Sequence, residues 1–182
     1  MKKIVVLFSG EGRNLHNIIK KLHNKECKVV CAITNNPKAK GLINLPIKSE
    51  VLRHNDFNSR KEHDKALVKL IGRYKPDLTV LAGFMRILTP EFTKNIKAIN
   101  LHPSLLPKHK GARAIQDSFD DKDTEAGVTV HWVEDELDGG EIIVQERFKK
   151  SNNETLESFT CKIKELEYKL LPQAIVKILY ES

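Results

Sequence analysis

The first 22 residues constrain the fold of this chain more than any other segment. Ile4 to Phe8 form an unbroken apolar run rich in β-branched side chains, which is typical of a strand covered on both faces. The glycine-containing segment Ser9 to Asn14 follows, and apolar residues then recur at helical spacing, at Leu15, Ile18, Ile19 and Leu22. A buried strand, a tight turn and an amphipathic helix together predict the opening of an α/β domain that binds a nucleotide or a phosphate.

Strand-like and helix-like segments alternate along the rest of the chain. Further strands are expected at Lys28 to Thr34, Ile47 to Leu52, Leu78 to Ala82, Ile96 to Leu101, Gly127 to Val133 and Glu141 to Arg147. Helices are expected at Ser59 to Tyr74, near Ala112 to Phe119, and from about Leu156 to Leu170, with an interruption or an end near Pro172. This order predicts one domain over residues 1–182, a Rossmann-like three-layer α/β domain whose sheet is mostly parallel, with a mixed edge formed by the last two strands.

The formal net charge of +7 indicates an anionic partner. The lysines are scattered along the chain, and only 6% of the residues are aromatic. This pattern does not fit the basic surface with interleaved aromatic residues that is typical of nucleic-acid binding. Anionic small molecules are therefore the expected partners, and no nucleic acid is expected.

Three further features bear on where the protein works. No segment approaches the roughly 20 consecutive apolar residues that cross a bilayer, so no membrane association is expected. The apolar run at the start of the chain is interrupted at Gly10, Glu11 and Arg13, which argues against a signal peptide. Cys27 and Cys31 lie in an apolar strand-like run without metal-site spacing, which predicts buried, reduced thiols. A cytoplasmic location follows as the expectation.

The turn from Ser9 to Asn14 has features of an anion-binding site. It places backbone N–H groups at a helix N-terminus, where the helix dipole favours a negative charge. Arg13 can add a charge-assisted contact to a phosphate. The turn lacks the third glycine of a dinucleotide-binding fingerprint and the Gly-Lys-Ser/Thr of a triphosphate loop. By itself it fits an ordinary tight connection between a strand and a helix equally well.

Asn100 and His102 form a more informative pair. They lie two positions apart at the end of a predicted strand, so their side chains point to the same side of the sheet. Open α/β sheets bind ligands at the carboxyl ends of parallel strands. An asparagine can donate to a developing oxyanion, and a histidine can act as an acid or a base near neutral pH. The alternative is a histidine that only caps the exit loop, which Pro103 and Pro107 make rigid.

An acidic turn at Asp135 to Gly140 supplies candidate carboxylates. Its two glycines let the backbone approach a ligand closely. A carboxylate here could hold the charge of a His102 imidazolium and receive a proton, although a solvated hairpin turn would have the same sequence. Thr129 and His131 alternate on the preceding strand and are a possible part of the same pocket. For His131, a strand histidine half in solvent is the alternative.

Four segments, in the same order along the chain, resemble the phosphoribosylglycinamide formyltransferases, a group of folate-dependent formyltransferases. The segments are Ser9 to Leu15, Leu81 to Leu88, Asn100 to Pro107 and Asp135 to Gly140, and the resemblance covers essentially the whole chain. It implies an enzyme of purine biosynthesis that transfers the formyl group of 10-formyltetrahydrofolate to the amine of 5-phosphoribosyl-glycinamide. It also implies small-molecule substrates, no metal, and a monomer or a homodimer.

The resemblance implies roles for individual residues. Asn100 and a protonated His102 would hydrogen-bond the oxyanion that forms when the amine attacks the formyl carbon. Asp138 would raise the pKa of His102 and help to remove the proton of the amine. Gly12, Arg13 and Asn14 would bind the phosphate of the acceptor, and Glu167 would bond its ribose hydroxyls. The folate would be bound by Arg60, Met85, Arg86, Ile87, Leu88, Asn100 and the segment from Glu134 to Asp138. The alternatives are a solvated Glu167 and, for Arg60, an ordinary residue of the first turn of a helix.

Three features depart from the pattern of these enzymes. Arg13 stands where many of them have serine, which should preserve or strengthen phosphate binding. Lys110 to Gln116 differs from their histidine-rich segment and is closer to that of methionyl-tRNA formyltransferase, which leaves the acceptor contacts there open. The segment Gly41 to Ile47 is short, which predicts a loop in place of one helix.

Other formyl-handling enzymes share the Asn-His-Asp set. Methionyl-tRNA formyltransferase would explain the basic charge, but it normally has an additional C-terminal β-barrel domain and lacks the phosphate turn at Ser9 to Asn14. Formyltetrahydrofolate hydrolase, which transfers the formyl group to water, normally has an N-terminal regulatory domain, whereas the first strand here begins at Ile4. A non-catalytic phosphate- or nucleotide-binding module is the alternative from a different class, and the presence of both His102 and Asp138 weighs against it.

Overall fold

The computed structural model describes residues 1–181, which form a seven-stranded sheet in the order β3-β2-β1-β4-β5-β6-β7. The strands from β3 to β5 in this order are parallel, and β6 and β7 are antiparallel to their neighbours. The strands are β1 (Lys3–Phe8), β2 (Lys28–Thr34), β3 (Ser49–Val51), β4 (Leu78–Leu81), β5 (Ala98–His102), β6 (Glu125–Trp132) and β7 (Ile142–Lys149). The helices are α1 (Arg13–Leu22), α2 (Arg60–Gly72), α3 (Pro90–Thr93), α4 (Ala114–Asp120) and α5 (Leu156–Tyr180), with 3-10 turns η1 (Lys40–Leu42) and η2 (His54–Asp56).

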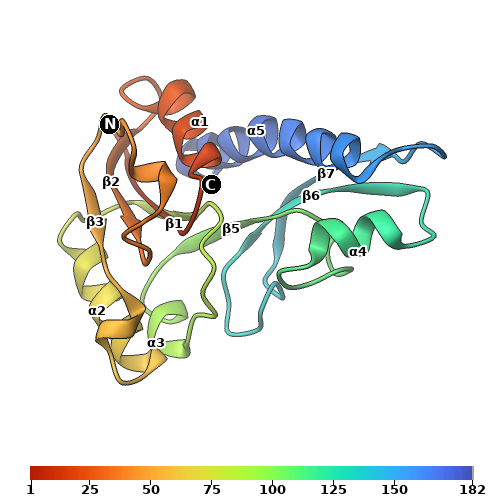
Figure 1. Ribbon diagram of the computed structural model, residues 1–182. Helices are drawn as coiled ribbons and strands as arrows, with labels where there is room; N and C mark the ends of the chain where they lie inside the picture. The colour runs from red at the N-terminus through yellow and green to blue at the C-terminus, as the bar shows by residue number, and fades with distance from the viewer. Residues whose placement is uncertain (182) are drawn as a thin grey trace.

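Helices cover both faces of the sheet, so the domain has three layers (Figure 1). On one face, α1 and α5 pack over a core that includes Phe8 and Phe159. On the other face, α2 packs over a second core that includes Leu7 and Leu67. Alternate residues of β1 thus enter opposite cores, which explains why Ile4 to Phe8 is apolar without a break. The predicted fold class, a mostly parallel three-layer sheet with a mixed edge, is confirmed.

The order of the strands reverses between β1 and β4. The chain moves outward from β1 to β2 and β3, and then returns to the other side of β1 to form β4 and β5. Open α/β sheets bind ligands at the carboxyl ends of the strands beside such a reversal. Here these ends lead into Ser9 and Gly83, and the Ser9 N–H donates to the Gly83 carbonyl over 3.0 Å. The topology therefore places two glycine-containing loops side by side at the edge where a ligand is expected.

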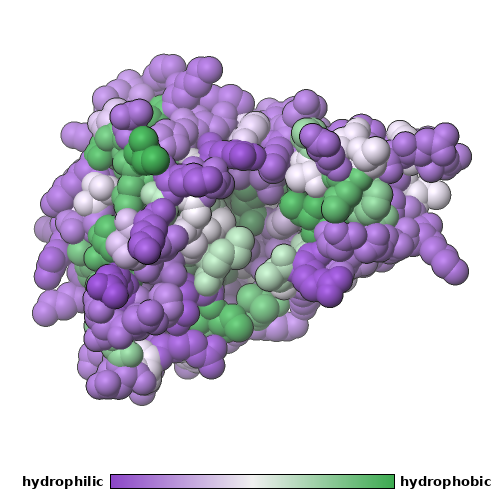
Figure 2. Space-filling view, in the orientation of Figure 1, coloured by the Kyte–Doolittle hydropathy of each residue, from purple (hydrophilic) through white to green (hydrophobic). Residues whose placement is uncertain are grey.

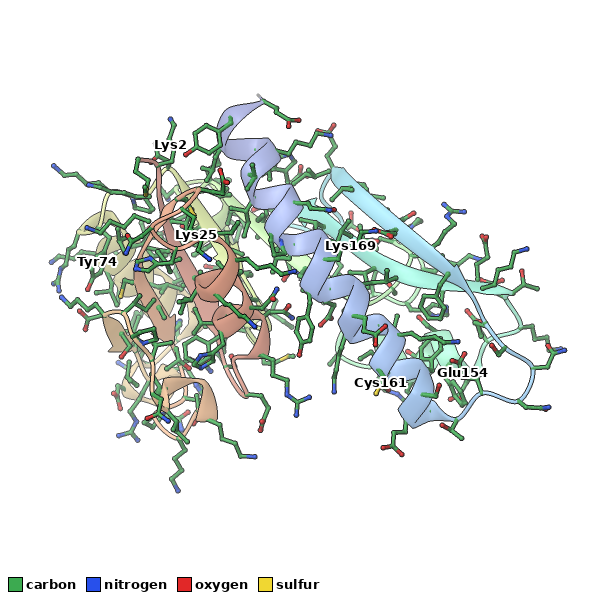
Figure 3. The ribbon with its side chains drawn as sticks, turned by 90° about the horizontal axis from the view of Figure 1, so that it is seen from above. Lys2, Lys25, Tyr74, Glu154, Cys161 and Lys169 are labelled. Atoms are coloured by element: carbon green, nitrogen blue, oxygen red, sulfur yellow. The ribbon has the colours of Figure 1, made fainter. Side chains whose placement is uncertain are left out.

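Helix α5 continues through Pro172 to Tyr180, so the predicted interruption or end at the proline is wrong. A proline has no N–H, so the carbonyl of Tyr168, four residues earlier, lacks its helical partner. That carbonyl instead accepts hydrogen bonds from Asn17 Nδ2 at 2.9 Å and from Lys21 Nζ at 2.8 Å, both on α1. Packing against α1 compensates the defect, and α5 crosses the sheet as one continuous helix (Figure 3).

The segment between β2 and α2 contains little regular structure. Gly41 to Ile47 carries only the end of the turn η1 in place of a full helix, as predicted. Gly12 and Gly41 meet closely here, because a Cβ on Gly12 would lie 2.5 Å from the Gly41 Cα. Gly12 also has a φ of +68°, so both its conformation and its surroundings require glycine at the start of α1.

Two of the three cysteines are buried, as predicted. Cys27 and Cys31 are buried free thiols, and burial raises the pKa of Cys27 to about 11. Cys161 is exposed on α5 (Figure 3). Among residues 1–181, no helix combines the length and the apolar character needed to cross a bilayer.

Candidate active site

A cavity of about 330 Å³ opens at the carboxyl ends of β4 and β5. The residues that line it are Leu81, His131 and four segments, which are Gly83 to Leu88, Asn100 to Pro103, Gly111 to Ala112 and Val133 to Asp138. A volume of this size is within the range of small-molecule sites. In Figure 2, white and green residues gather in a hollow near the middle of the face, with hydrophilic residues around it.

The predicted residues Asn100, His102 and Asp138 meet at the wall of this cavity. His102 Nδ1 lies 3.5 Å from Asp138 Oδ2, and Asn100 Nδ2 lies 3.4 Å from Asp138 Oδ1. His131 lies opposite Asn100 on β6, and its Nε2 lies 3.2 Å from Asn100 Nδ2 and 3.6 Å from Asp138 Oδ1. Its Nδ1 donates to the Trp132 carbonyl at 2.8 Å. Two adjacent strands and one turn therefore build a polar cluster that is mostly buried.

Burial and charge act against each other on the ionisation of His102 and Asp138. Burial lowers the pKa of His102, although the His109 carbonyl and the Asp138 carboxylate favour the protonated form. Burial acts to raise the pKa of Asp138, but hydrogen bonds from His131 and the Gly111 N–H hold it below its ordinary value. Asp138 therefore acts on His102 in the expected direction, while burial is the larger effect on the imidazole.

The loop after β4 presents apolar side chains to the cavity. Met85 and Ile87 are 69% and 54% exposed, and Leu137, from the acidic turn, is 47% exposed. All three line the same cavity. Exposed apolar side chains that gather beside a cavity are typical of a binding surface.

Hydrogen bonds fix both ends of this loop. The Met85 N–H donates to Ser9 Oγ at 2.8 Å, and the Thr89 N–H donates to Asp64 Oδ2 at 2.7 Å. In the described part of the chain, the N–H groups of Ile87 and Leu88 have no partner. The middle of the loop therefore offers free backbone donors beside the apolar side chains.

A second group of predicted residues meets where α1 begins. Gly12 caps α1 without a side-chain hydrogen bond, which leaves the N–H groups of the first turn available to an anion. Arg13 is exposed at the first position of the helix. Asn14 Nδ2 donates to Glu167 Oε2 at 3.0 Å, which joins α1 to α5. Asn14 Oδ1 is buried without a partner among residues 1–181, and burial raises the pKa of Glu167.

Two further predicted residues belong neither to the cavity lining nor to the group at the start of α1. Arg60 is exposed at the first position of α2. Thr129 is fully buried, and its hydroxyl donates to the Ser104 carbonyl at 2.7 Å and accepts from the Leu106 N–H at 3.2 Å. Thr129 thus holds the loop after β5 in place. The expectation that it lines the pocket with His131 is wrong, because that loop covers its side chain.

The glycines of the acidic turn have a structural reason that the sequence did not reveal. A Cβ on Gly140 would lie 1.9 Å from the Trp132 carbonyl oxygen, and one on Gly139 would lie 2.6 Å from the Glu136 side chain. The turn therefore needs glycine because the chain packs closely against itself. Asp138, which directly precedes these two glycines, has a φ of +50°, a conformation that aspartate tolerates better than most residues.

The sequence did not predict how residues 108–113 lie over the polar cluster. His102 Nε2 donates to the His109 carbonyl at 2.8 Å, and the Gly111 N–H donates to Asp138 Oδ2 at 2.8 Å. Lys110 Nζ bonds Glu136 Oε1 at 2.7 Å. In the sequence, Lys110 to Gln116 differs from the histidine-rich segment of the phosphoribosylglycinamide formyltransferases, but this difference did not indicate which contacts the segment makes.

One group of side chains outside the cavity has potential metal ligands. His109, Asp121 and Asp123 place one ligand atom each within 4.8 Å of the others. Lys150 Nζ bonds Asp121 Oδ1 at 2.7 Å, and Lys108 Nζ bonds Asp123. Two ammonium groups of the chain thus already neutralise these carboxylates.

Known proteins resemble the chain over nearly its whole length. The chain is 38% identical to phosphoribosylglycinamide formyltransferase of Haemophilus influenzae, over 96% of this chain and 86% of the relative. It is 37% identical to the enzyme of the same name from Escherichia coli, over 94% and 84%. The crystal structure of phosphoribosylglycinamide formyltransferase from Campylobacter jejuni superposes with a TM-score of 0.95 at 47% identity, and covers 98% of this chain and 97% of that one. The sequence pattern of the formyl transferase family matches residues 2–175, and the chain belongs to that family.

Proposed function

We propose that this protein transfers the formyl group of 10-formyltetrahydrofolate to the amine of 5-phosphoribosyl-glycinamide. The observation that carries the proposal is the position of the Asn100, His102 and Asp138 cluster at the wall of a cavity with an apolar lining. The relatives at 37% and 38% identity have names that specify this reaction, which supports the same acceptor here.

The donor fits the side of the cavity formed by the loop after β4. The pteridine ring would pack against Met85, Ile87 and Leu137, which are exposed and apolar. Its polar edge would bond the free N–H groups of Ile87 and Leu88 and neighbouring carbonyls, including that of Arg86. The exposed backbone from Glu134 toward Asp138 would contact the same ring system. Arg60 is outside the cavity lining, so we assign it to the outer, anionic part of the folate.

The acceptor fits the group of residues where α1 begins. Its phosphate would lie at the first turn of α1, against the N–H groups after Gly12 and the guanidinium of Arg13. Its ribose hydroxyls would donate to Glu167 and to the unpaired Asn14 Oδ1. Both groups are acceptors, and a pair of adjacent hydroxyls supplies two donors.

The transfer itself needs one bond to form and one to break at the formyl carbon. The acceptor amine attacks the formyl carbon, and the carbonyl oxygen becomes an oxyanion. Asn100 Nδ2 and a protonated His102 donate hydrogen bonds to that oxyanion, and His102 does so through Nδ1, because its Nε2–H is bonded to the His109 carbonyl. The bond from the carbon to N10 of the folate then breaks, and tetrahydrofolate leaves with a proton on N10.

Protons move through His102 and Asp138 in this account. The attacking amine must lose a proton, and Asp138 is an ionised acceptor that is 3.5 Å from the imidazole. Because burial favours the neutral imidazole, the carboxylate charge is what allows His102 to carry a proton at the oxyanion. His102 then donates a proton as the intermediate collapses.

We further propose a single formyltransferase domain over residues 1–182 that acts on small molecules in the cytoplasm, as a monomer or a homodimer and without a metal. Buried free thiols at Cys27 and Cys31 support a reducing compartment. The chemistry described above needs no Lewis acid, because the oxyanion has two hydrogen-bond donors.

An isotope-transfer experiment tests the proposed reaction. Donor labelled with ¹³C in its formyl group is mixed with phosphoribosylglycinamide and the purified protein, and the products are followed by NMR. We expect the label to appear in a formamide on the acceptor nitrogen, together with unlabelled tetrahydrofolate. Appearance of the label only as free formate would refute transfer to the amine.

A further inference from the structure

His102 is held from behind by the backbone of His109. His102 Nε2 donates to the His109 carbonyl at 2.8 Å, and the Ser104 hydroxyl donates to the adjacent Lys108 carbonyl at 2.7 Å and lies 3.3 Å from the His109 carbonyl oxygen. The imidazole of His102 is buried, so this contact is shielded from solvent. It fixes the proton on Nε2 and leaves Nδ1 to face Asp138.

The conformation of His109 needs support from its own side chain. His109 has a φ of +56°, in the left-handed region that residues other than glycine rarely adopt. Its Nε2 donates to Asp121 Oδ2 at 2.5 Å, and both side chains are largely buried, with about one fifth of each exposed. This charge-assisted hydrogen bond ties the His109 side chain to the residue that follows α4.

Lys150 in turn fixes Asp121. Its ammonium group donates to Asp121 Oδ1 at 2.7 Å, to the Asp121 carbonyl at 3.0 Å and to the Ser118 carbonyl at 2.7 Å. The lysine side chain is only 13% exposed, and these three contacts use all three of its protons. The C-terminal end of α4 is thereby tied to the residue that follows β7, and Asp121 has no freedom to turn away from His109.

We infer that His109 is a positioning residue for the formyl transfer, anchored by Asp121 and Lys150, which sets the orientation and the proton position of His102. The inference rests on the proposed function, because it assigns a purpose to the orientation of His102. It does not place His109 in contact with either substrate. The residue acts through its carbonyl, so its side chain is used only to hold the backbone.

The test compares three variants with the unmodified protein. His109→Ala removes the anchor and keeps the carbonyl. His109→Gln restores a donor at nearly the position of Nε2. Lys108→Ala is the matched control, because it breaks the neighbouring ion pair with Asp123 and keeps the contact between His109 and Asp121.

We expect His109→Ala to lower kcat by about 10-fold to 100-fold with both KM values within about twofold, as misplacement of a reacting group does. We expect His109→Gln to recover most of this loss and Lys108→Ala to show none.

An NMR measurement on the ring nitrogens of His102 gives a second readout that needs no activity. In the unmodified protein, the neutral ring should carry its proton on Nε2, with slow exchange against solvent. In His109→Ala, that proton should exchange faster and the Nδ1 tautomer should become populated.

A proton on Nδ1 in the unmodified neutral ring would overturn the inference, even if a variant failed to fold. So would a normal kcat in His109→Ala, or an equal loss in the Lys108→Ala control. A protein that lacks formyl transfer but shows the expected ring signals would contradict the proposed function and leave the His109 contact established.

Discussion

Replacement of Asp138 by asparagine should nearly abolish turnover without unfolding the protein. Asparagine has almost the same shape, and it tolerates the positive φ of this position as well as aspartate does. Its side-chain oxygen can still accept from the Gly111 N–H. What the variant loses is a negative charge 3.5 Å from His102 Nδ1 and an acceptor for the proton of the amine.

The size of the effect follows from that distance. Two unit charges 3.5 Å apart attract by about 1 kcal/mol in water and about 5 kcal/mol at an effective dielectric constant of 20. Loss of the charge alone therefore lowers the rate about tenfold or more, and loss of a general base typically contributes a factor of about 10² to 10⁴. We expect kcat to fall by about 10² to 10⁴, with the KM for the folate nearly unchanged.

The pH dependence tells the two losses apart. Burial already lowers the pKa of His102, and Asp138 is one of the groups that oppose it, so the pKa should fall further in the variant. The imidazolium then forms only at lower pH, and the residual activity should shift toward lower pH. Steady-state kinetics across pH and an NMR titration of His102 measure both effects, with the exposed Glu157→Gln as a control. His102→Asn should be equally damaging and the double variant little worse than either. Near-normal turnover, or an unchanged His102 pKa, would show that Asp138 has only a structural role in the turn from Asp135 to Gly140.

Three further predictions concern the acceptor, the charge and the loop after β5. Arg13→Ser should raise the KM for phosphoribosylglycinamide with little effect on the KM for the folate or on kcat, because it removes a contact made equally in the ground and transition states; a large fall in kcat alone would exclude this role. Added salt should raise the KM for phosphoribosylglycinamide, because screening weakens the attraction of this anion to a chain of net charge +7. Tight binding of generic RNA at about 150 mM salt would contradict the interpretation that the positive charge serves to attract small anions. Thr129→Val should lower the free energy of unfolding by about 1 to 3 kcal/mol in urea titrations, because it leaves Ser104 and Leu106 without their partner; an unchanged midpoint would count against that role.

Local patterns in the sequence predicted most of the fold and the centre of the site. The period of two on β5 was enough to put Asn100 and His102 on one side of the sheet, and the strand order then placed them at a ligand-binding edge. The four-residue helix α3 was missed, since so short a helix has no periodic signal.

The errors arose where distant segments decide the outcome. Pro172 does not end α5, because Asn17 and Lys21 on α1 bond the carbonyl that the proline leaves free. Thr129 does not line the cavity, because its hydroxyl is bonded to the loop after β5, at Ser104, which lies 25 residues earlier in the sequence. The contact of His102 with His109 is made between a side chain and a backbone carbonyl. Any residue type could supply such a carbonyl, so no sequence pattern marks it.

The ratio of kcat/KM for three acceptors tests the central claim most directly. The same donor, 10-formyltetrahydrofolate, is supplied with phosphoribosylglycinamide, with aminoacylated initiator tRNA, or with water alone, and release of tetrahydrofolate is followed in each case. Our account predicts rapid turnover with phosphoribosylglycinamide and no comparable rate with tRNA or water, because the first turn of α1 and the Asn14 and Glu167 pair suit a small sugar phosphate. Robust formylation of the tRNA without turnover of phosphoribosylglycinamide would contradict it.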